Sequence, residues 1–279
     1  MTMNIGISFS VCYAEAVELI NDKDPCNIYL SLLDYFTGFA SNNGFKLIEI
    51  ISFPPFDSFI LNKITAEIKE RIENFDTIYH LPSWEINISA INPFVRRVSI
   101  EETKRLIDLA EILDIDMVSM HPGCYASMPD IYRFAKEQVR MISRQSIYEI
   151  FEYCRGKGID LCLENLQFNE PFYRKPDEFK PFIEKGIGML LDTAHAVTSG
   201  INPIDFVERY ENRVCEVHLV DGFKGKMDKH YPLGTGEVDY VSFLNDLQRR
   251  GSNVKIILEL KSEQDIITSL DLLQKNRFI

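Results

Sequence analysis

The chain alternates between short, continuous apolar runs and longer segments with helical periodicity. Eight runs rich in Ile, Val, Leu and Met lie at residues 4–9, 46–51, 76–81, 116–121, 159–164, 187–192, 214–219 and 254–260. Most of them are apolar throughout, which is typical of parallel strands covered on both faces. The pattern therefore predicts eight repeated strand–helix units.

Two of the intervening segments carry clear helix signals. Residues 99–114 begin with Ser99 and have Glu102 three positions later, which predicts an N-cap with a capping box. Residues 129–158 are periodic and end in Gly158, as expected at the C-terminus of a helix. We therefore expect one helix over each of these segments.

The length of the chain allows one large fold or two smaller ones. With 279 residues, of which 46% are hydrophobic, it could form one α/β barrel or two ordinary domains. Two domains would need a linker near the middle, and the sequence has no Pro-, Gly- or Ser-rich stretch there. We therefore predict one domain over residues 1–279, with the α/β fold of a single (β/α)8 TIM barrel.

Charge and cysteine content limit the partners and the compartment. The 42 acidic residues outnumber the 30 Lys and Arg, and the resulting net charge of −12 disfavours nucleic acid and anionic membranes. The six cysteines are scattered singly, and no window reaches the roughly 18 apolar residues of a membrane span. We expect a cytoplasmic protein with a small-molecule substrate. A homo-oligomer is compatible with the sequence, which leaves the oligomeric state open.

Histidines and carboxylates gather at the ends of the predicted strands, where TIM barrels build their active sites. At or just beyond these ends lie His80, His121, Glu164, Asp192, His195, His218, Asp228, His230 and Glu259, a set that includes all five histidines. Imidazoles and carboxylates without thiolates suit Zn²⁺ or Mn²⁺. Cys124 is the one cysteine near this end. Asp221 and Glu237 are expected to be hydrogen-bonding or solvated loop acids.

An ordered set of motifs resembles the xylose isomerase-like TIM barrels. This superfamily contains sugar phosphate isomerases and epimerases and the endonuclease IV enzymes of AP endonuclease family 2. The motifs are MHPG (120–123), LENL (163–166), LLDTAHA (190–196), VHLVDG (217–222), DKHYPLGTGEVD (228–239) and ILEL (257–260). The resemblance spans essentially the whole chain, and the ordered set is more specific than any single motif.

The resemblance implies two sets of metal ligands. The site common to the superfamily falls on Glu164, Asp192, His218 and Glu259. The endonuclease IV branch adds one ion held by His80, His121 and a bridging Glu164, and another held by His195, Asp228 and His230. The chain is therefore expected to bind one to three divalent metal ions, with Zn and Mn as the leading candidates.

Further residues are candidates for binding the substrate. Residues 81–98, after the third strand, contain the single tryptophan, Trp84, which could stack on a ligand, and Arg96 and Arg97, which could clamp an anion. The alternative is a solvated loop pinned by one aromatic residue. Glu170 could bind a substrate hydroxyl. The segment after the first strand lacks the glycine-containing loop of the endonucleases, which argues against insertion into DNA.

Two reactions fit these residues. The favoured one is that of a divalent-metal-dependent sugar or sugar-phosphate isomerase or epimerase with Glu164 and Glu259 as its acid–base pair. We favour it because most chains of this resemblance are thought to handle small carbohydrate-like substrates. The alternative is a zinc-dependent hydrolase with a two- or three-metal cluster, cleaving a phosphodiester or amide of a small molecule. A barrel that binds metal without turnover is a third reading, which the presence of both glutamates opposes.

Overall fold

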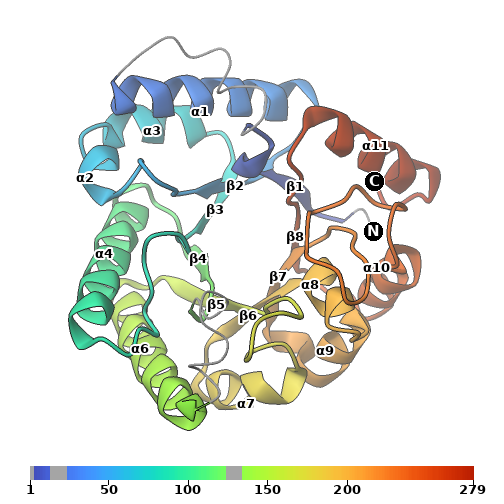
Figure 1. The fold of residues 1–279 in the computed structure, drawn as a ribbon. Coiled ribbons are helices and arrows are strands. Elements are labelled where there is room, and N and C mark those ends of the chain that lie inside the picture. The colour runs from blue at the N-terminus through green and yellow to red at the C-terminus, as the bar shows by residue number, and fades with distance from the viewer. Residues whose placement is uncertain (1–2, 13–23, 124–133) are drawn as a thin grey trace.

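A computed structural model describes residues 3–12, 24–123 and 134–279 as a ring of strands enclosed by helices (Figure 1). Within this part of the chain, eight parallel strands pair in sequence order, and β1 also pairs with β8, so that the sheet closes. The strands are β1 (Ile5–Ser8), β2 (Leu47–Ile51), β3 (Asp76–His80), β4 (Met117–Met120), β5 (Asp160–Glu164), β6 (Gly188–Asp192), β7 (Val214–His218) and β8 (Lys255–Leu258). The predicted (β/α)8 barrel is confirmed, and each strand lies within a predicted run.

Helices cover the outside of the barrel, and both ends of the chain lie near β1 and β8 (Figure 1). The helical elements are η1 (Phe9–Cys12), α1 (Pro25–Asn42), α2 (Ser58–Leu61), α3 (Thr65–Ile72), α4 (Pro93–Ile112), α6 (Lys136–Lys157), α7 (Pro176–Lys185), α8 (Thr193–Thr198), α9 (Pro203–Tyr210), η2 (Glu211–Arg213), α10 (Tyr240–Arg249) and α11 (Glu263–Lys275). None of the helices in the described part of the chain has the length and apolarity needed to cross a membrane.

Strands β2 to β8 divide their side chains between two separate cores. In β2, Ile48 and Ile50 pack outward in the large cluster formed with the helices, whereas Leu47 belongs to a small cluster inside the barrel. Because side chains alternate along a strand, Glu49 lies on the inner side with Leu47. The continuous apolar pattern thus reflects burial on both faces, and the inward positions decide what the barrel interior contains.

The helix predicted over 99–114 begins six residues earlier than expected. α4 starts at Pro93, and its N-cap is Asn92, whose side chain accepts a hydrogen bond from the Phe94 amide. Ser99 lies inside the helix and donates its hydroxyl to the Val95 carbonyl, so its predicted role as N-cap was wrong. Asn followed by Pro is itself a strong start signal, and it outweighs the capping box predicted downstream.

The segment predicted as a helix over 129–158 is described from residue 134 onward. α6 covers Lys136–Lys157 and ends at Gly158, whose positive φ of 73° gives the expected left-handed cap. The start of the predicted helix lies outside the described residues, as does Cys124.

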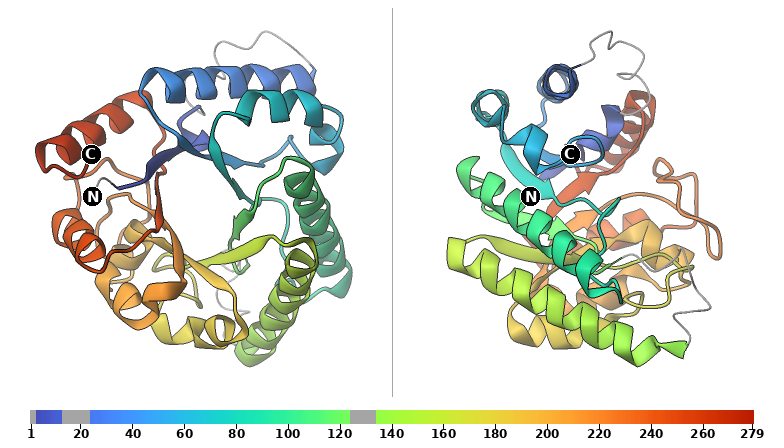
Figure 2. Two further views of the ribbon diagram at one scale, coloured as in Figure 1. Left: turned by 180° about the vertical axis from the view of Figure 1, so that it is seen from behind. Right: turned by 60° about the vertical axis from the view of Figure 1, so that its left-hand side comes forward.

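The loops that follow the strands project from one side of the barrel, as the right-hand view of Figure 2 shows for the loop between β7 and α10. Asp221 organises this loop from within, because its buried carboxylate accepts hydrogen bonds from the amides of Gly222, Gly236 and Val238. The expectation of a hydrogen-bonding loop acid is confirmed for Asp221. The loop is thereby folded back on the barrel, where it carries Asp228 and His230.

Candidate metal centre

All nine candidate metal ligands lie at the C-terminal mouth of the barrel. Four of them end strands, two follow a strand directly, and three lie in the connections after β6 and β7. In chain order they are His80, His121, Glu164, Asp192, His195, His218, Asp228, His230 and Glu259. Glu164, Asp192 and His218 are at most 1% exposed, and His121 is the most accessible of the histidines at 28% of its side chain.

Glu164 lies among three imidazoles. Its Oε2 is 2.8 Å from His121 Nε2 and 3.1 Å from His80 Nε2, and its Oε1 is 3.1 Å from His195 Nδ1. One carboxylate at the end of β5 therefore connects groups from β3, β4 and α8. This is the position that the sequence assigned to a bridging ligand.

Asp192 performs two tasks at the end of β6. Its Oδ1 accepts a hydrogen bond from the His195 amide and thereby caps α8, which fixes where the His195 ring lies. Its Oδ2 is buried and has no hydrogen-bond partner in the described structure. Asp228 approaches the same ring from the loop after β7, with its Oδ2 3.6 Å from His195 Nε2, and it also contacts His230.

His218 connects the mouth of the barrel with its interior. Its Nδ1 lies 2.8 Å from Glu259 Oε2 and 3.9 Å from Asp192 Oδ2, on the side of the other candidate ligands. Its Nε2 lies 2.9 Å from Glu49 Oε2 and 3.7 Å from Glu216 Oε1, one layer deeper in the barrel. His218, Glu49 and Glu216 are each fully buried.

Backbone carbonyls fix the tautomers of three histidines. The Nδ1 atoms of His80, His195 and His230 lie 2.8 to 2.9 Å from the carbonyl oxygens of Leu81, Asn165 and Glu259, respectively. A carbonyl can only accept, so each Nδ1 carries the hydrogen. Each Nε2 then faces a carboxylate with its lone pair, an arrangement that is stable only when a proton or a metal cation lies between the two groups.

The pKa values of the histidines follow from these contacts. Burial alone would lower the pKa of His80, but the hydrogen bond to Glu164 and the charge of Glu49 raise it to about 9. His230 behaves similarly, because Glu259 and Asp228 overcome the effect of burial and raise its pKa to about 9. The carboxylates beside His195 likewise hold its pKa well above its usual value, despite burial. Without metal, these imidazoles hold protons at neutral pH.

The carboxylates divide into two kinds. Burial would raise the pKa of Glu259, but His230 and His218 bring it down to about 2, and the histidines around Glu164 hold its pKa well below the usual range. For Asp192 and Glu216, burial prevails and raises the pKa to about 6 and about 7. These four carboxylates differ in pKa because histidine nitrogens lie 2.8 to 3.1 Å from Glu164 and Glu259 but 3.7 to 3.9 Å from Glu216 and Asp192.

The donor set fits divalent metal ions. In three groups the candidate ligand atoms lie within 4.8 Å of one another, as atoms sharing an ion at about 2.0 to 2.2 Å would. The groups are His80–His121–Glu164, Asp192–His195–His230 and Glu164–Asp192–His218. Asp192 Oδ2, which has no hydrogen-bond partner in the described structure, belongs to the last group, and a cation bound there would supply its missing partner.

Glu49 and Glu216 are the residues of this region that the sequence did not reveal. Each stands in the middle of an apolar run, and no motif marks it. Strand alternation could have placed both inside a barrel, but it could not show that they meet His218. A carboxylate that accepts from the second ring nitrogen of a metal-binding histidine orients the ring and makes it a better ligand, which is the geometry of Glu49.

Loop residues after β5 hold the other ligands in place. The Asn165 side chain exchanges two hydrogen bonds with the backbone of Asp192, and Gln167 accepts from the Asp228 amide. Gln167 also lines the pocket over the centre. Glu170, which the sequence proposed for substrate binding, donates its amide to the Gln167 carbonyl, and it is not among the described residues that line the pocket.

A pocket of about 320 Å³ opens above the centre. Its described lining includes the candidate ligands His80, His121, Glu164, His195, Asp228, His230 and Glu259, together with Ser10, Ser52, Ser83, Trp84, Gln167 and Lys261. Trp84 lines this pocket with 60% of its surface exposed, and its predicted role in stacking on a ligand stays a prediction. Lys261, just after β8, was missed because a lysine beside a strand end is a common sequence feature.

Arg96 and Arg97 do not reach this pocket in the described structure. Both lie in the first turns of α4, because the helix begins inside the segment predicted as a loop over 81–98. Arg96 donates to the carbonyls of Ala90 and Ile91, and Arg97 pairs with Glu101 and Glu149. The helix geometry directs these two side chains to partners outside the mouth of the barrel, so the structure does not bring them to the substrate side.

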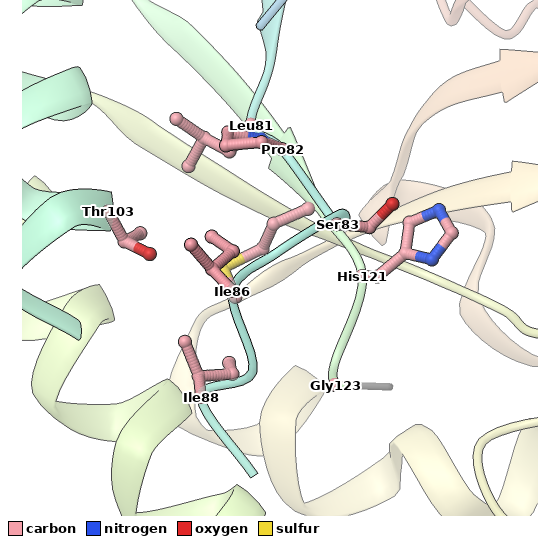
Figure 3. A pocket seen from close by; sticks show the side chains of 9 residues that line it. Leu81, Pro82, Ser83, Ile86, Ile88, Thr103, His121 and Gly123 are labelled. Atoms are coloured by element: carbon pink, nitrogen blue, oxygen red, sulfur yellow. The ribbon is translucent and has the colours of Figure 1, made fainter. Parts of the chain in front are cut away.

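The remainder of the loop packs beside His121. Figure 3 shows Leu81, Ile86 and Ile88 around a small apolar cavity, with Ser83 and His121 next to each other at its edge. These aliphatic side chains anchor the loop on the barrel, so that Trp84 is held over the pocket by packing on either side.

The sequence profile of the xylose isomerase-like TIM barrel family matches residues 38–276. The chain belongs to this family. This match includes β3 to β8 and therefore all the candidate metal ligands from His80 to Glu259.

Individual proteins resemble the chain more distantly. An uncharacterised protein of Methanocaldococcus jannaschii is 27% identical over 221 residues, which are 76% of this chain and 73% of that protein. A probable endonuclease 4 of Thermoplasma acidophilum is 22% identical over 254 residues, 81% of this chain and 84% of the other. The crystal structure of a D-tagatose 3-epimerase-like protein superposes with a TM-score of 0.79 at 23% identity, covering 99% of this chain and 97% of the other.

Replacing Glu49 tests the support that it gives to His218. The substitution Glu49→Gln removes the charge behind the ring while keeping its size, and we expect it to weaken metal binding by about tenfold or more. Glu237→Gln, on the exposed part of the loop after β7, is the matched control and should bind as the unmodified protein does. Equal affinities of the two variants, measured by competition with a chelator, would contradict the role of Glu49.

The protonated histidines predict how metal binding depends on pH. Metals bind the neutral imidazole, whereas His80 and His230, with pKa values of about 9, are protonated at neutral pH. Binding should therefore release protons, and affinity should rise with pH up to about 9. Titration calorimetry in two buffers of different ionisation enthalpy measures this release, and a heat that does not depend on the buffer would refute it.

Proposed function

We propose that this protein is a divalent-metal-dependent isomerase or epimerase of a small sugar or sugar phosphate, with Glu164 and Glu259 as its acid–base pair. The observation that carries the proposal is that these two carboxylates, from β5 and β8, face one pocket. Both belong to a centre whose donor set suits a divalent metal. Epimerisation at the carbon next to a carbonyl uses this combination of an ion that polarises the carbonyl and two groups that transfer protons.

The rest of the pocket suits a polyhydroxylated molecule. Around the candidate ligands, its described lining offers the hydroxyls of Ser10, Ser52 and Ser83 and the amide of Gln167. Lys261 is the one lysine or arginine in this lining, which is enough to bind one phosphate but offers no track for a polynucleotide. Together with the net charge of −12, this supports a small-molecule substrate over nucleic acid.

Glu164, Asp192, His218 and Glu259 would hold the central metal. When bound, the ion would polarise the carbonyl and neighbouring hydroxyl of the open-chain sugar. One glutamate, as the carboxylate, would accept the proton from the carbon next to the carbonyl. The other, which must enter the step as the carboxylic acid, would deliver its proton to the opposite face of that carbon. Because one carboxylate gains a proton while the other loses one, the pair is ready for the reverse reaction without net proton uptake.

The exposed Trp84 would provide a surface for the sugar. An indole face packs against the C–H side of a sugar ring or chain, while the hydroxyls remain turned toward polar groups of the pocket. Trp84 lines the same pocket as the candidate ligands but is exposed, so it would hold the substrate from the solvent side of the pocket.

The fold comparison is in keeping with this proposal. The D-tagatose 3-epimerase-like protein shares the whole architecture of this chain. Fold likeness alone does not carry an activity, so the proposal depends on the paired glutamates and the pocket.

A zinc-dependent hydrolase is the second candidate, and a specific observation favours it. Glu164 contacts three imidazoles, and two further groups of ligands flank the central one, each with two histidines. Two or three zinc ions bound there could activate water for attack on a phosphodiester or amide of a small molecule. The similarity to a probable endonuclease 4 also supports this candidate.

Deuterium exchange distinguishes the two candidates. The protein, loaded separately with Mn²⁺, Mg²⁺ or Zn²⁺, is incubated in D₂O with ketohexoses, ketopentoses and their phosphates, and the products are examined by NMR. We expect deuterium at the carbon next to the carbonyl, and a loss of about 100-fold or more in Glu259→Gln. Glu237→Gln serves as the control and should retain the activity, and metal analysis of each variant separates lost ions from lost proton transfer.

The zinc-loaded protein is tested in parallel on bis(4-nitrophenyl) phosphate and on 4-nitroanilides. Cleavage of these substrates without exchange into any ketose would overturn the isomerase proposal and support the hydrolase. Exchange that persists unchanged in Glu259→Gln would show that the proposed acid–base pair is wrong.

A further inference from the structure

Two thiols meet inside the barrel, below the candidate metal centre. Cys162 on β5 and Cys215 on β7 lie on either side of Gly188 on β6. A Cβ atom added to Gly188 would be 2.8 Å from Cys162 Sγ and 2.9 Å from Cys215 Sγ. Both sulfurs therefore approach the same point, and the missing side chain of Gly188 leaves the space that they share.

An irregularity in β7 turns Cys215 toward this space. Between β6 and β7, Met189 pairs with Val214 but the next residue, Leu190, pairs with Glu216, so that Cys215 is an extra residue without a partner. In a regular strand Cys215 would point away from the side on which Glu216 lies. A bulge redirects the side chain, and Cys215 packs against the inner cluster that contains Cys162 and Met117.

Of the two cysteines, Cys215 can be reached from solvent. A pocket of about 380 Å³ at this end of the barrel is lined by Cys215 and Met117, with Arg250 and Lys255 among its other residues. Cys215 is partly exposed, whereas Cys162 is fully buried behind it. A small ion could enter through this pocket without passing the metal centre.

The two thiols influence each other's ionisation. The hydrogen bond from Cys162 lowers the pKa of the Cys215 thiol to about 7, and the same contact together with burial holds the pKa of Cys162 well above its usual value. Metals bind the thiolate form of cysteine, so any thiol proton still present is released when an ion binds.

The spacing of the strands favours a bridging ion over a disulfide. β5 and β7 are separated by β6, and neighbouring strands lie about 4.8 Å apart, so the two backbones are roughly 10 Å apart. A disulfide requires Cα atoms within about 7 Å. An ion with metal–sulfur bonds of about 2.3 Å joins two sulfurs that are farther apart than any disulfide allows.

We propose that Cys162 and Cys215 form a binding site for a soft monovalent metal cation of the Cu(I) type, with the Met117 thioether as a third sulfur nearby. Binding forms two metal–sulfur bonds and releases the two thiol protons to water, with no change in oxidation state. The site differs in chemistry from the imidazole and carboxylate centre, which suits harder ions. It also joins β5 and β7, whose other ends carry Glu164 and His218.

Titration with Cu(I) tests the site. The reduced protein is titrated anaerobically with the Cu(I)–bicinchoninate complex, while the metal centre is kept saturated with Zn²⁺. We expect one Cu(I) per chain and a thiolate-to-metal absorption band. Both should be lost, or the affinity reduced by about tenfold or more, in Cys162→Ser and in Cys215→Ser. Cys154→Ser is the matched control, because Cys154 lies on α6 and is buried in the outer core, away from the two thiols.

Protection of Cys215 provides a second measurement in the unmodified protein, which applies even if a serine variant fails to fold. Iodoacetamide labelling followed by peptide mass spectrometry should show slower alkylation of Cys215 once Cu(I) is added. Unchanged alkylation of Cys215, or a Cys154→Ser variant that loses Cu(I) as completely as Cys215→Ser does, would overturn the proposal.

Discussion

Buried carboxylates repel one another unless positive charge lies among them, and this constraint governs the mouth of the barrel. Six carboxylates gather there and in the layer below, at Glu49, Glu164, Asp192, Glu216, Asp228 and Glu259, and all five histidines of the chain lie beside them. Without a partner, each buried charge would destabilise the folded state through the loss of its hydration. Protons on the histidines or divalent ions between the groups supply the compensation, and the histidine tautomers set by backbone carbonyls suit the ions.

The barrel makes this concentration of charge tolerable by layering its interior. Leu47, Ile78 and Leu190 fill part of the interior with apolar side chains. Glu49 and Glu216 lie in register beside Ile78 and Leu190 and contact His218 from below. The candidate ligands lie at the top, where the loops after β5 and β7 brace them through Asn165, Gln167 and Asp221. The candidate ligands are thereby gathered at one end of the barrel, and the outer core fixes the directions of the strands.

Sequence reasoning reached the fold and the candidate ligands because both follow from simple periodicity. Continuous apolar runs mark strands buried on both faces, and in a parallel barrel the residues that end such runs must meet at one mouth. Glu49 and Glu216 could not be predicted as part of the site, because nothing in the local sequence distinguishes an inward glutamate from an outward one. Their role depends on contact with His218, which is more than 160 positions away from Glu49. The sequence analysis predicts a loop at Arg96 and Arg97. Asn92 and Pro93 are a helix start signal, and they place both arginines in the first turns of α4.

The central claim is that the nine polar side chains at the barrel mouth form a metal centre organised around Glu164, Asp192, His218 and Glu259. Anomalous scattering from crystals of the protein saturated with Zn²⁺ or Mn²⁺ tests it most directly. The account predicts an ion bound by this central set, with any further ions at His80 and His121 or at His195, Asp228 and His230. Metal-saturated crystals without an anomalous peak at the central set would contradict it.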